Sequence, residues 1–183
     1  LVSLTTKWPG YASNVVVLQS KFSPAHGERE ELRKILGSKN RFFRPDGAMA
    51  KPIIYSHGGF IFAALICSDL TNITHRNALR GEVDAVFVIE WNQDTKTFSS
   101  LVEASAIDLH AYVIQANNRR FGDSRIRVPA DKDFERDVVQ IKGGLSDYYV
   151  LGEVDFWRLR TEQCQRIKKP KFKPVPIGYV VSD

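Results

Sequence analysis

Cys67 ends an uninterrupted apolar run, FIFAALIC, and is followed at once by Ser68 and Asp69. A cysteine becomes a useful nucleophile when a nearby cation, a helix N-terminus or a paired base raises its thiolate fraction. The pattern places Cys67 where a buried strand passes into a polar turn, and α/β proteins carry their sites in such loops. Cysteines are also common packing residues, so this position alone leaves a catalytic and a structural interpretation open.

The segments around Cys67 alternate between strand-like and helix-like patterns. Short apolar or β-branched runs predict strands at residues 13–20, 60–67, 84–91 and 112–118, and start and stop signals or periodicity predict helices at 23–38, 73–83 and 99–111. The runs 137–144 and 148–155 predict a hairpin or adjacent strands around Gly143 and Gly144. This alternation predicts an α/β or layered α+β fold.

The composition fits one globular core. The chain has 183 residues, of which 43% are hydrophobic, and its longest apolar run is of strand length rather than of the length that a membrane span requires. Its first residues show no charged segment followed by a long apolar one, so we expect no signal peptide. The two cysteines, Cys67 and Cys164, form no disulfide framework, which favours a cytoplasmic location.

Five motifs occur in a fixed order along the chain. They are LQSKFSPAHGE with Lys21 and Glu28, FAALICSD with Cys67 and Asp69, RGEVDAVFVIEWN, EASAIDLHAYVIQANNRRFGDSRIRVP, and YYVLGEVD ending at Asp155. In this order they resemble the carbon–nitrogen hydrolase (nitrilase) superfamily, and specifically the C-terminal two-thirds of a family domain. The third motif fits more loosely, because bulkier residues replace the usual small ones.

The resemblance implies an αββα sandwich that lacks its first strands and helices. It also implies a thiol hydrolase that cleaves a non-peptide carbon–nitrogen bond through a cysteine acyl-enzyme, with an amide or carbamoyl group favoured over a nitrile and with no cofactor. By resemblance Cys67 is the nucleophile, Lys21 stabilises the tetrahedral intermediate, Glu28 orients the site, and the backbone N–H of Ser68 is a second oxyanion donor. The substrate-pocket candidates are Glu90, Trp91, Asn92, Arg119 and Phe121. Family members commonly dimerise, so we expect self-association.

One departure concerns the general base. The family's general-base glutamate lies upstream of its lysine, whereas none of the 20 residues before Lys21 is Asp or Glu. We therefore expect the chain to be part of a longer protein, or to be completed by a partner. The alternative is a catalytically silent nitrilase-like interaction module of a larger protein, associated with nucleic acid.

Other candidate groups give weaker signals. The four histidines show no spacing typical of a zinc site, and His57 is either a partner for the thiol or a turn residue. The loop with Arg119, Arg120 and Arg125 fits either an anion-binding site or a solvated turn.

The C-terminal segment is basic. We predict a nitrilase-like domain at 1–165 and a basic, proline-containing tail at 166–183, with four lysines at 168, 169, 171 and 173. Such a segment either stays in water or lies along nucleic acid or an acidic partner.

Overall fold

The computed structural model describes residues 2–8, 11–22, 24–25, 27–36, 51–165 and 167–181. It divides the chain into two compact units, Leu1–Phe42 and Phe43–Asp183. The first unit contains an antiparallel hairpin of β1 (Val2–Trp8) and β2 (Tyr11–Val17), followed by helix α1 (Glu28–Leu36). The predicted strand at 13–20 and the predicted helix at 23–38 are thus both confirmed, with α1 beginning at Glu28.

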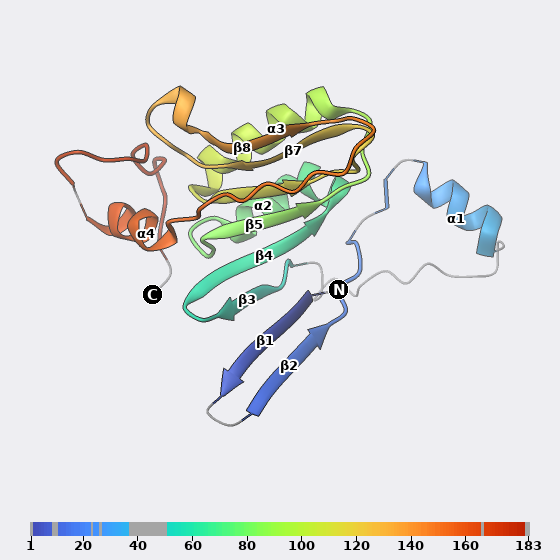
Figure 1. Cartoon of the computed structure of the whole chain (residues 1–183), viewed down its shortest axis with the longest axis horizontal. Coiled ribbons are helices and arrows are strands. Elements are labelled where there is room, and N and C mark those ends of the chain that lie inside the picture. The colour runs from blue at the N-terminus through green and yellow to red at the C-terminus, as the bar shows by residue number, and fades with distance from the viewer. Residues whose placement is uncertain are drawn as a thin grey trace. The chain divides into compact units, whose positions relative to one another are not determined.

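The second unit is built on a six-stranded sheet of order β3-β4-β5-β6-β7-β8 (Figure 1). Its strands are β3 (Ile54–His57), β4 (Phe60–Ile66), β5 (Ala85–Ile89), β6 (Tyr112–Ala116), β7 (Gly122–Arg127) and β8 (Asp137–Lys142). The central strands β4, β5 and β6 are parallel, and the remaining pairs are antiparallel. The helical segments are η2 (Cys67–Thr71), α2 (Ile73–Leu79), α3 (Thr95–Leu109), η3 (Asp133–Glu135) and α4 (Phe156–Cys164).

The alternation of side chains along the central strands gives the sheet two different faces. One face carries aliphatic residues that are completely buried, at positions 63, 65, 86, 88 and 113. Helix α3 packs over this face against β6 and β7, and α2 packs against α3. These are the apolar strands that the sequence predicts to be covered on both faces.

The opposite face carries an aromatic row. The ring of Phe62 lies 5.6 Å from that of Phe60 and 5.3 Å from that of Phe87. Farther along this face, Leu159 of α4 joins a buried cluster with Tyr112 and Phe172. In Figure 1 the segment that leads to α4 crosses in front of the sheet, whereas α2 and α3 lie behind it.

That crossing segment corrects one prediction. Residues 148–155 form no strand, so the predicted hairpin or adjacent strand with β8 is wrong. A Cβ atom at Gly152 would lie 2.8 Å from side-chain atoms of both Ile126 and Val139, which shows that the segment lies flat on the sheet face. Gly152 and the partly buried Val154 thus contact the sheet face, whereas Tyr149 and Leu151 point to solvent, and none of the segment extends the sheet at its edge.

The C-terminal segment differs from the solvated tail that its lysines suggested. Phe172 is 1% exposed, and a β-bridge pairs it with Ala130. The carboxylate of Glu162 accepts hydrogen bonds from the backbone N–H groups of Lys171 and Phe172, at 2.9 Å each to Oε2. Burial raises the pKa of Glu162, but these N–H groups and Arg158 outweigh burial and lower it below its ordinary value. Residues 171–173 thus belong to the folded second unit.

The α/β class predicted from the sequence is confirmed. The second unit supplies a helix-covered sheet of the kind that makes up one half of an αββα sandwich. The longest described helix, α3, has 15 residues, and no helix in the described ranges combines the length and the hydropathy needed to cross a membrane.

Candidate active site

Cys67 lies on a strained turn at the end of β4. Its φ angle is 50°, in the left-handed region that residues with a Cβ seldom adopt. The buried Asp69 fixes this turn, because its carboxylate accepts a hydrogen bond of 3.2 Å from the backbone N–H of Ile66, and the next residue, Leu70, is also fully buried. Strain of this kind persists only where the surroundings impose it, and it concentrates at functional sites. The thiol is half-buried and forms no disulfide.

The register of the sheet shows what lies beside this turn. Ile66, the last residue of β4, pairs with Ile89, the last of β5, which pairs with Ala116, the last of β6. The residues that directly follow these three adjacent parallel strands are Cys67, Glu90 and Asn117. Neighbouring strands lie about 4.8 Å apart. The prediction that Cys67 lies at the carboxyl edge of the sheet is thereby confirmed.

Asn117 connects the loops at this edge. Its side-chain oxygen accepts from the backbone N–H of Asn92, and its side-chain nitrogen donates to the carbonyl oxygens of Asn92 and Gly122, each at 2.9 Å. Its own backbone N–H donates to Ser124 Oγ. The pocket candidate Asn92 is thus held in place by Asn117, which the sequence analysis did not single out, although its position directly after an apolar strand was a signal for it.

Glu90 faces the helix-covered side of the sheet. It is 7% exposed, and its Oε2 accepts a hydrogen bond of 3.0 Å from Nε2 of the buried Gln115. Burial raises the pKa of Glu90 to about 7, against the opposing effects of the hydrogen bond from Gln115 and of the nearby Asn92 side chain. The next residue, Trp91, has a side chain that is 77% exposed. Of these two pocket candidates, one is therefore a buried acid and the other a surface residue.

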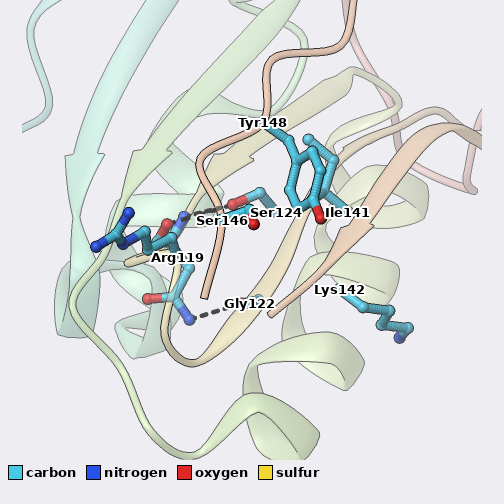
Figure 2. Close-up of a pocket in the computed structure, with 8 residues that line it drawn as sticks. Arg119, Gly122, Ser124, Ile141, Lys142, Ser146 and Tyr148 are labelled. Carbon is cyan, nitrogen blue, oxygen red and sulfur yellow. Dashed lines mark hydrogen bonds between the residues drawn. The ribbon is translucent and has the colours of Figure 1, made fainter. Parts of the chain in front are cut away.

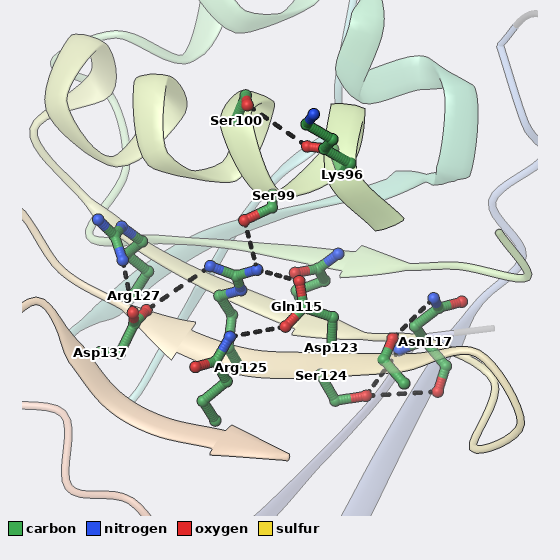
Figure 3. Close-up of polar contacts among 12 residues, drawn as sticks. Lys96, Ser99, Ser100, Gln115, Asn117, Asp123, Ser124, Arg125, Arg127 and Asp137 are labelled. Carbon is green, nitrogen blue, oxygen red and sulfur yellow. Dashed lines mark hydrogen bonds and ion pairs between the residues drawn. The ribbon is translucent and has the colours of Figure 1, made fainter. Parts of the chain in front are cut away.

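The arginines predicted to bind an anion have different roles. Arg125 is buried and forms an ion pair with Asp123 and a hydrogen bond of 2.8 Å with Ser99 Oγ, whereas the neighbouring Arg127 bonds to Asp137 at 2.6 Å (Figure 3). Burial raises the pKa of Asp123, but hydrogen bonds from Lys142 and Gln140 and the charge of Arg125 outweigh it and lower this pKa. Because its charge is used inside the protein, Arg125 is not available to a ligand. That part of the anion-site prediction is wrong.

Arg119, in contrast, lines a hollow of about 90 Å³ at the same end of the sheet (Figure 2). It forms an exposed ion pair of 2.7 Å with Asp147. The remaining lining residues are mostly polar: Asn117, Gly122, Ser124, Ile141, Lys142, Ser146 and Tyr148. Phe121, a further pocket candidate, is not among them. The sequence analysis missed Tyr148, which it assigned to the strand predicted at 148–155, and Ser146, which lies between the two predicted strands.

Lys21 and Glu28 contact each other in the first unit. Lys21 Nζ lies 2.6 and 2.8 Å from the two carboxylate oxygens of Glu28, and the backbone N–H of Ala25 donates to Glu28 Oε2 at 2.7 Å. Burial raises the pKa of Glu28, but these donors outweigh it and lower the pKa. Glu28 therefore remains ionised and fixes the position of the Lys21 ammonium. Cys67 and Ser68 belong to the second unit.

Solved structures show the same fold. A mutant of the Nesterenkonia AN1 amidase from the nitrilase superfamily, with a cysteine replaced by alanine, matches with a TM-score of 0.52 over 73% of this chain and 51% of that chain, at 15% identity. The chain has the fold of the nitrilase superfamily. It spans about half the length of that amidase.

Two further nitrilase-superfamily structures match less closely. Nit3 from Saccharomyces cerevisiae, a member of branch 10 of the superfamily, gives a TM-score of 0.45 at 16% identity over 52% of this chain and 38% of that chain. A CN-hydrolase superfamily protein from Xanthomonas campestris, with an arsenic adduct in its active site, gives 0.48 at 13% identity over 74% and 50%. Comparison with protein-family models and with curated protein sequences gives no match. The evidence for the nitrilase fold is thus structural.

Proposed function

We propose that this chain is the cysteine-bearing part of a nitrilase-type thiol hydrolase that cleaves an amide or carbamoyl carbon–nitrogen bond. The observation that carries the proposal is the left-handed backbone of Cys67 at the junction of β4 and η2. Such a turn holds a nucleophile at the carboxyl edge of a parallel sheet, where α/β proteins bind substrates.

In the proposed reaction the Cys67 thiolate attacks the carbonyl carbon of the substrate. The carbon–sulfur bond forms as the carbonyl π electrons move to oxygen, and the resulting oxyanion accepts hydrogen bonds from Lys21 and from the backbone N–H of Ser68. Collapse of this intermediate breaks the carbon–nitrogen bond, and the nitrogen takes up the proton that the Cys67 thiol gave up and leaves as ammonia or an amine. Water then attacks the thioester, which releases the acid and restores the thiol.

The ion pair of Lys21 and Glu28 supports this assignment. A lysine ammonium that donates to two carboxylate oxygens and is largely buried has a fixed position. Preorganised charge is what an oxyanion site requires, since it then needs no rearrangement during the reaction.

The hollow beside Arg119 is the proposed binding site for the rest of the substrate. It is reached from the same carboxyl edge as Cys67, and β6 is two strands away from β4, or about 10 Å at ordinary strand spacing. Its small volume and polar lining favour a short substrate with a polar or anionic end. Asn92 and Asn117 shape the wall between the two positions.

The experiment is a measurement of ammonia release from a panel of short aliphatic amides and carbamoyl compounds. We expect turnover that is abolished in C67A, reduced at least about a hundredfold in K21M, and retained in C164A, which removes the other cysteine. Turnover that survives in C67A, or its absence from the wild-type chain with every compound, contradicts the proposal.

A second candidate function rests on the anchored C-terminal segment. Lys168 and Lys169 are exposed directly before the buried Phe172, so the fold displays them in a fixed place. This favours the alternative of an interaction module that contacts nucleic acid. Deleting residues 166–173 would remove the Phe172 anchor as well, and the clean test is therefore the double variant K168A/K169A.

We also propose that the chain self-associates. Several large apolar side chains of the crossing segment are exposed, namely Leu145, Tyr149 and Leu151, each at 90% or more. Exposed apolar groups of this kind favour a covering surface, for which we propose a second copy of the chain. Light scattering during size-exclusion chromatography tests this, and a mass of one chain at all concentrations contradicts it.

A further inference from the structure

Glu90 and Gln115 present two buried oxygen atoms that lack hydrogen-bond partners. Gln115 Nε2 donates to Glu90 Oε2 at 3.0 Å, and both side chains are more than nine-tenths buried. Within the described part of the chain, Glu90 Oε1 and Gln115 Oε1 accept from no donor. Two buried acceptors without a donor are costly, because each has lost its hydrogen bonds to water without replacing them.

A single proton on Glu90 gives both oxygen atoms a hydrogen-bond partner. If Glu90 Oε1 carries a proton, it donates to Gln115 Oε1 while Gln115 Nε2 donates to Glu90 Oε2. The result is a closed pair of hydrogen bonds between a carboxylic acid and an amide, in which every group has the donor or acceptor that its chemistry requires. Within this pair, only a protonated carboxyl group can donate a hydrogen bond to the amide oxygen. The proton is therefore placed on Glu90.

The surrounding charges favour the same protonation state. The nearest cation, Arg125, is already paired with Asp123 and bonded to Ser99, and Asp123 places a second negative charge nearby. The segment η2, which packs against β5, also contains the carboxylate of Asp69. Among the described residues, Arg125 is the cation that acts on Glu90, and its charge is already paired with Asp123; burial raises the pKa of Glu90 to about 7.

We propose that Glu90 and Gln115 share a proton beside the Cys67 turn, and that Glu90 is a positioning residue that sets the pH range in which Cys67 forms a thiolate. The register places Glu90 one strand away from Cys67. When Glu90 is protonated, the pair is neutral and places no negative charge near the Cys67 thiolate. When the proton is lost, a buried negative charge lies about one strand spacing from Cys67 and disfavours a second one. This inference rests on the proposed function, because it assigns Glu90 a role toward the proposed nucleophile.

The first test is a titration of the full chain by carbon-13 NMR with glutamate labelled at Cδ. The Glu90 signal is assigned as the one that E90Q or, if that variant does not fold, E90D changes. We expect a midpoint near 7 for Glu90, and in Q115M, which removes the amide donor, a higher one. A wild-type midpoint between about 4 and 5 overturns the shared proton, because it shows that a bound water or another donor satisfies the carboxylate.

The second test is the pH dependence of Cys67 alkylation by iodoacetamide, followed by peptide mass spectrometry. We expect equal rates for wild type and E90Q near pH 6. Near pH 8 we expect a rate about threefold higher in E90Q, because removal of the charge lowers the thiol pKa by about one unit from an ordinary value near 8.5. E153Q, which neutralises an exposed glutamate, serves as the matched control and should follow wild type. Superimposable profiles for wild type and E90Q overturn the role toward Cys67.

Neither test measures turnover. If Cys67 proves not to be a hydrolytic nucleophile, the NMR midpoint still decides whether the proton is shared. Conversely, a normal Glu90 midpoint leaves the proposed hydrolase intact and refutes only this inference.

Discussion

The left-handed turn at Cys67 predicts an unusual response to glycine. At most positions glycine is less stabilising than alanine, because it has more backbone freedom to lose on folding. At Cys67, where φ is 50°, a Cβ atom is itself unfavourable. We therefore predict that C67G is more stable than C67A.

The magnitude follows from two opposing effects. The left-handed conformation costs a residue with a Cβ about 1–2 kcal/mol, which glycine avoids. Glycine in turn loses about 0.4–1 kcal/mol through the greater entropy of the unfolded chain. The net advantage of C67G over C67A is therefore about 0.5–1 kcal/mol, or roughly 1–4 °C in Tm for a chain of this size.

The assay is thermal unfolding followed by circular dichroism, with A104G as the matched control. Ala104 is exposed in the middle of α3, where glycine should lower the free energy of unfolding by about 1 kcal/mol relative to wild type. The two sites thus predict effects of opposite sign. If C67G falls below C67A by as much as A104G falls below wild type, the turn is not left-handed in solution and the main support for a nucleophile at Cys67 is lost.

Further predictions follow from the same structure. F172A should lower the free energy of unfolding by about 3–5 kcal/mol in urea denaturation, because Phe172 is fully buried against Tyr112 and Leu159; an effect below about 1 kcal/mol would mean that the C-terminal segment is solvated after all. The raised pKa of Glu90 makes its contribution to stability complete below about pH 4.5, its value in the unfolded chain, and lost as pH rises through about 7. Unfolding midpoints should accordingly fall over this interval in wild type and fall less in E90Q, whereas identical slopes would refute the assignment. K168A/K169A should weaken binding to single-stranded nucleic acid at low salt without changing Tm, and unchanged binding would show that these lysines are simply solvated.

The parts of the fold that the sequence predicted have strong local signals. The fully apolar runs at 60–67 and 84–91 became β4 and β5, because both faces of a central parallel strand are covered and the pattern reports this directly. Residues 148–155 gave a similar β-type pattern and yet form no strand. The segment lies on the sheet face at Gly152, and composition does not distinguish a segment that lies on a sheet from one that pairs with it.

The candidate site also contains residues that the local sequence predicted and residues that it could not predict. Cys67 could be located from the apolar run that precedes it, and Lys21 and Glu28 from a motif whose two members do contact each other. Gln115 and Asn117 could not, because their importance depends on the register between strands that are far apart in sequence. Arg125 was placed in an anion-binding or solvated loop for the same reason. Its contact with Ser99 forms only when β7 packs against α3, and there it also pairs with Asp123.

The most direct test of the proposed nucleophile compares the two cysteines of one chain. Cys164 is exposed and Cys67 is half-buried, so exposure alone predicts faster alkylation of Cys164. If Cys67 is an activated thiol supported by Lys21, iodoacetamide at about pH 6.5 should alkylate it at least about tenfold faster than Cys164, and K21M should abolish this difference. Alkylation of Cys67 no faster than that of Cys164, or unchanged by K21M, would contradict the catalytic pair on which the proposed hydrolase depends.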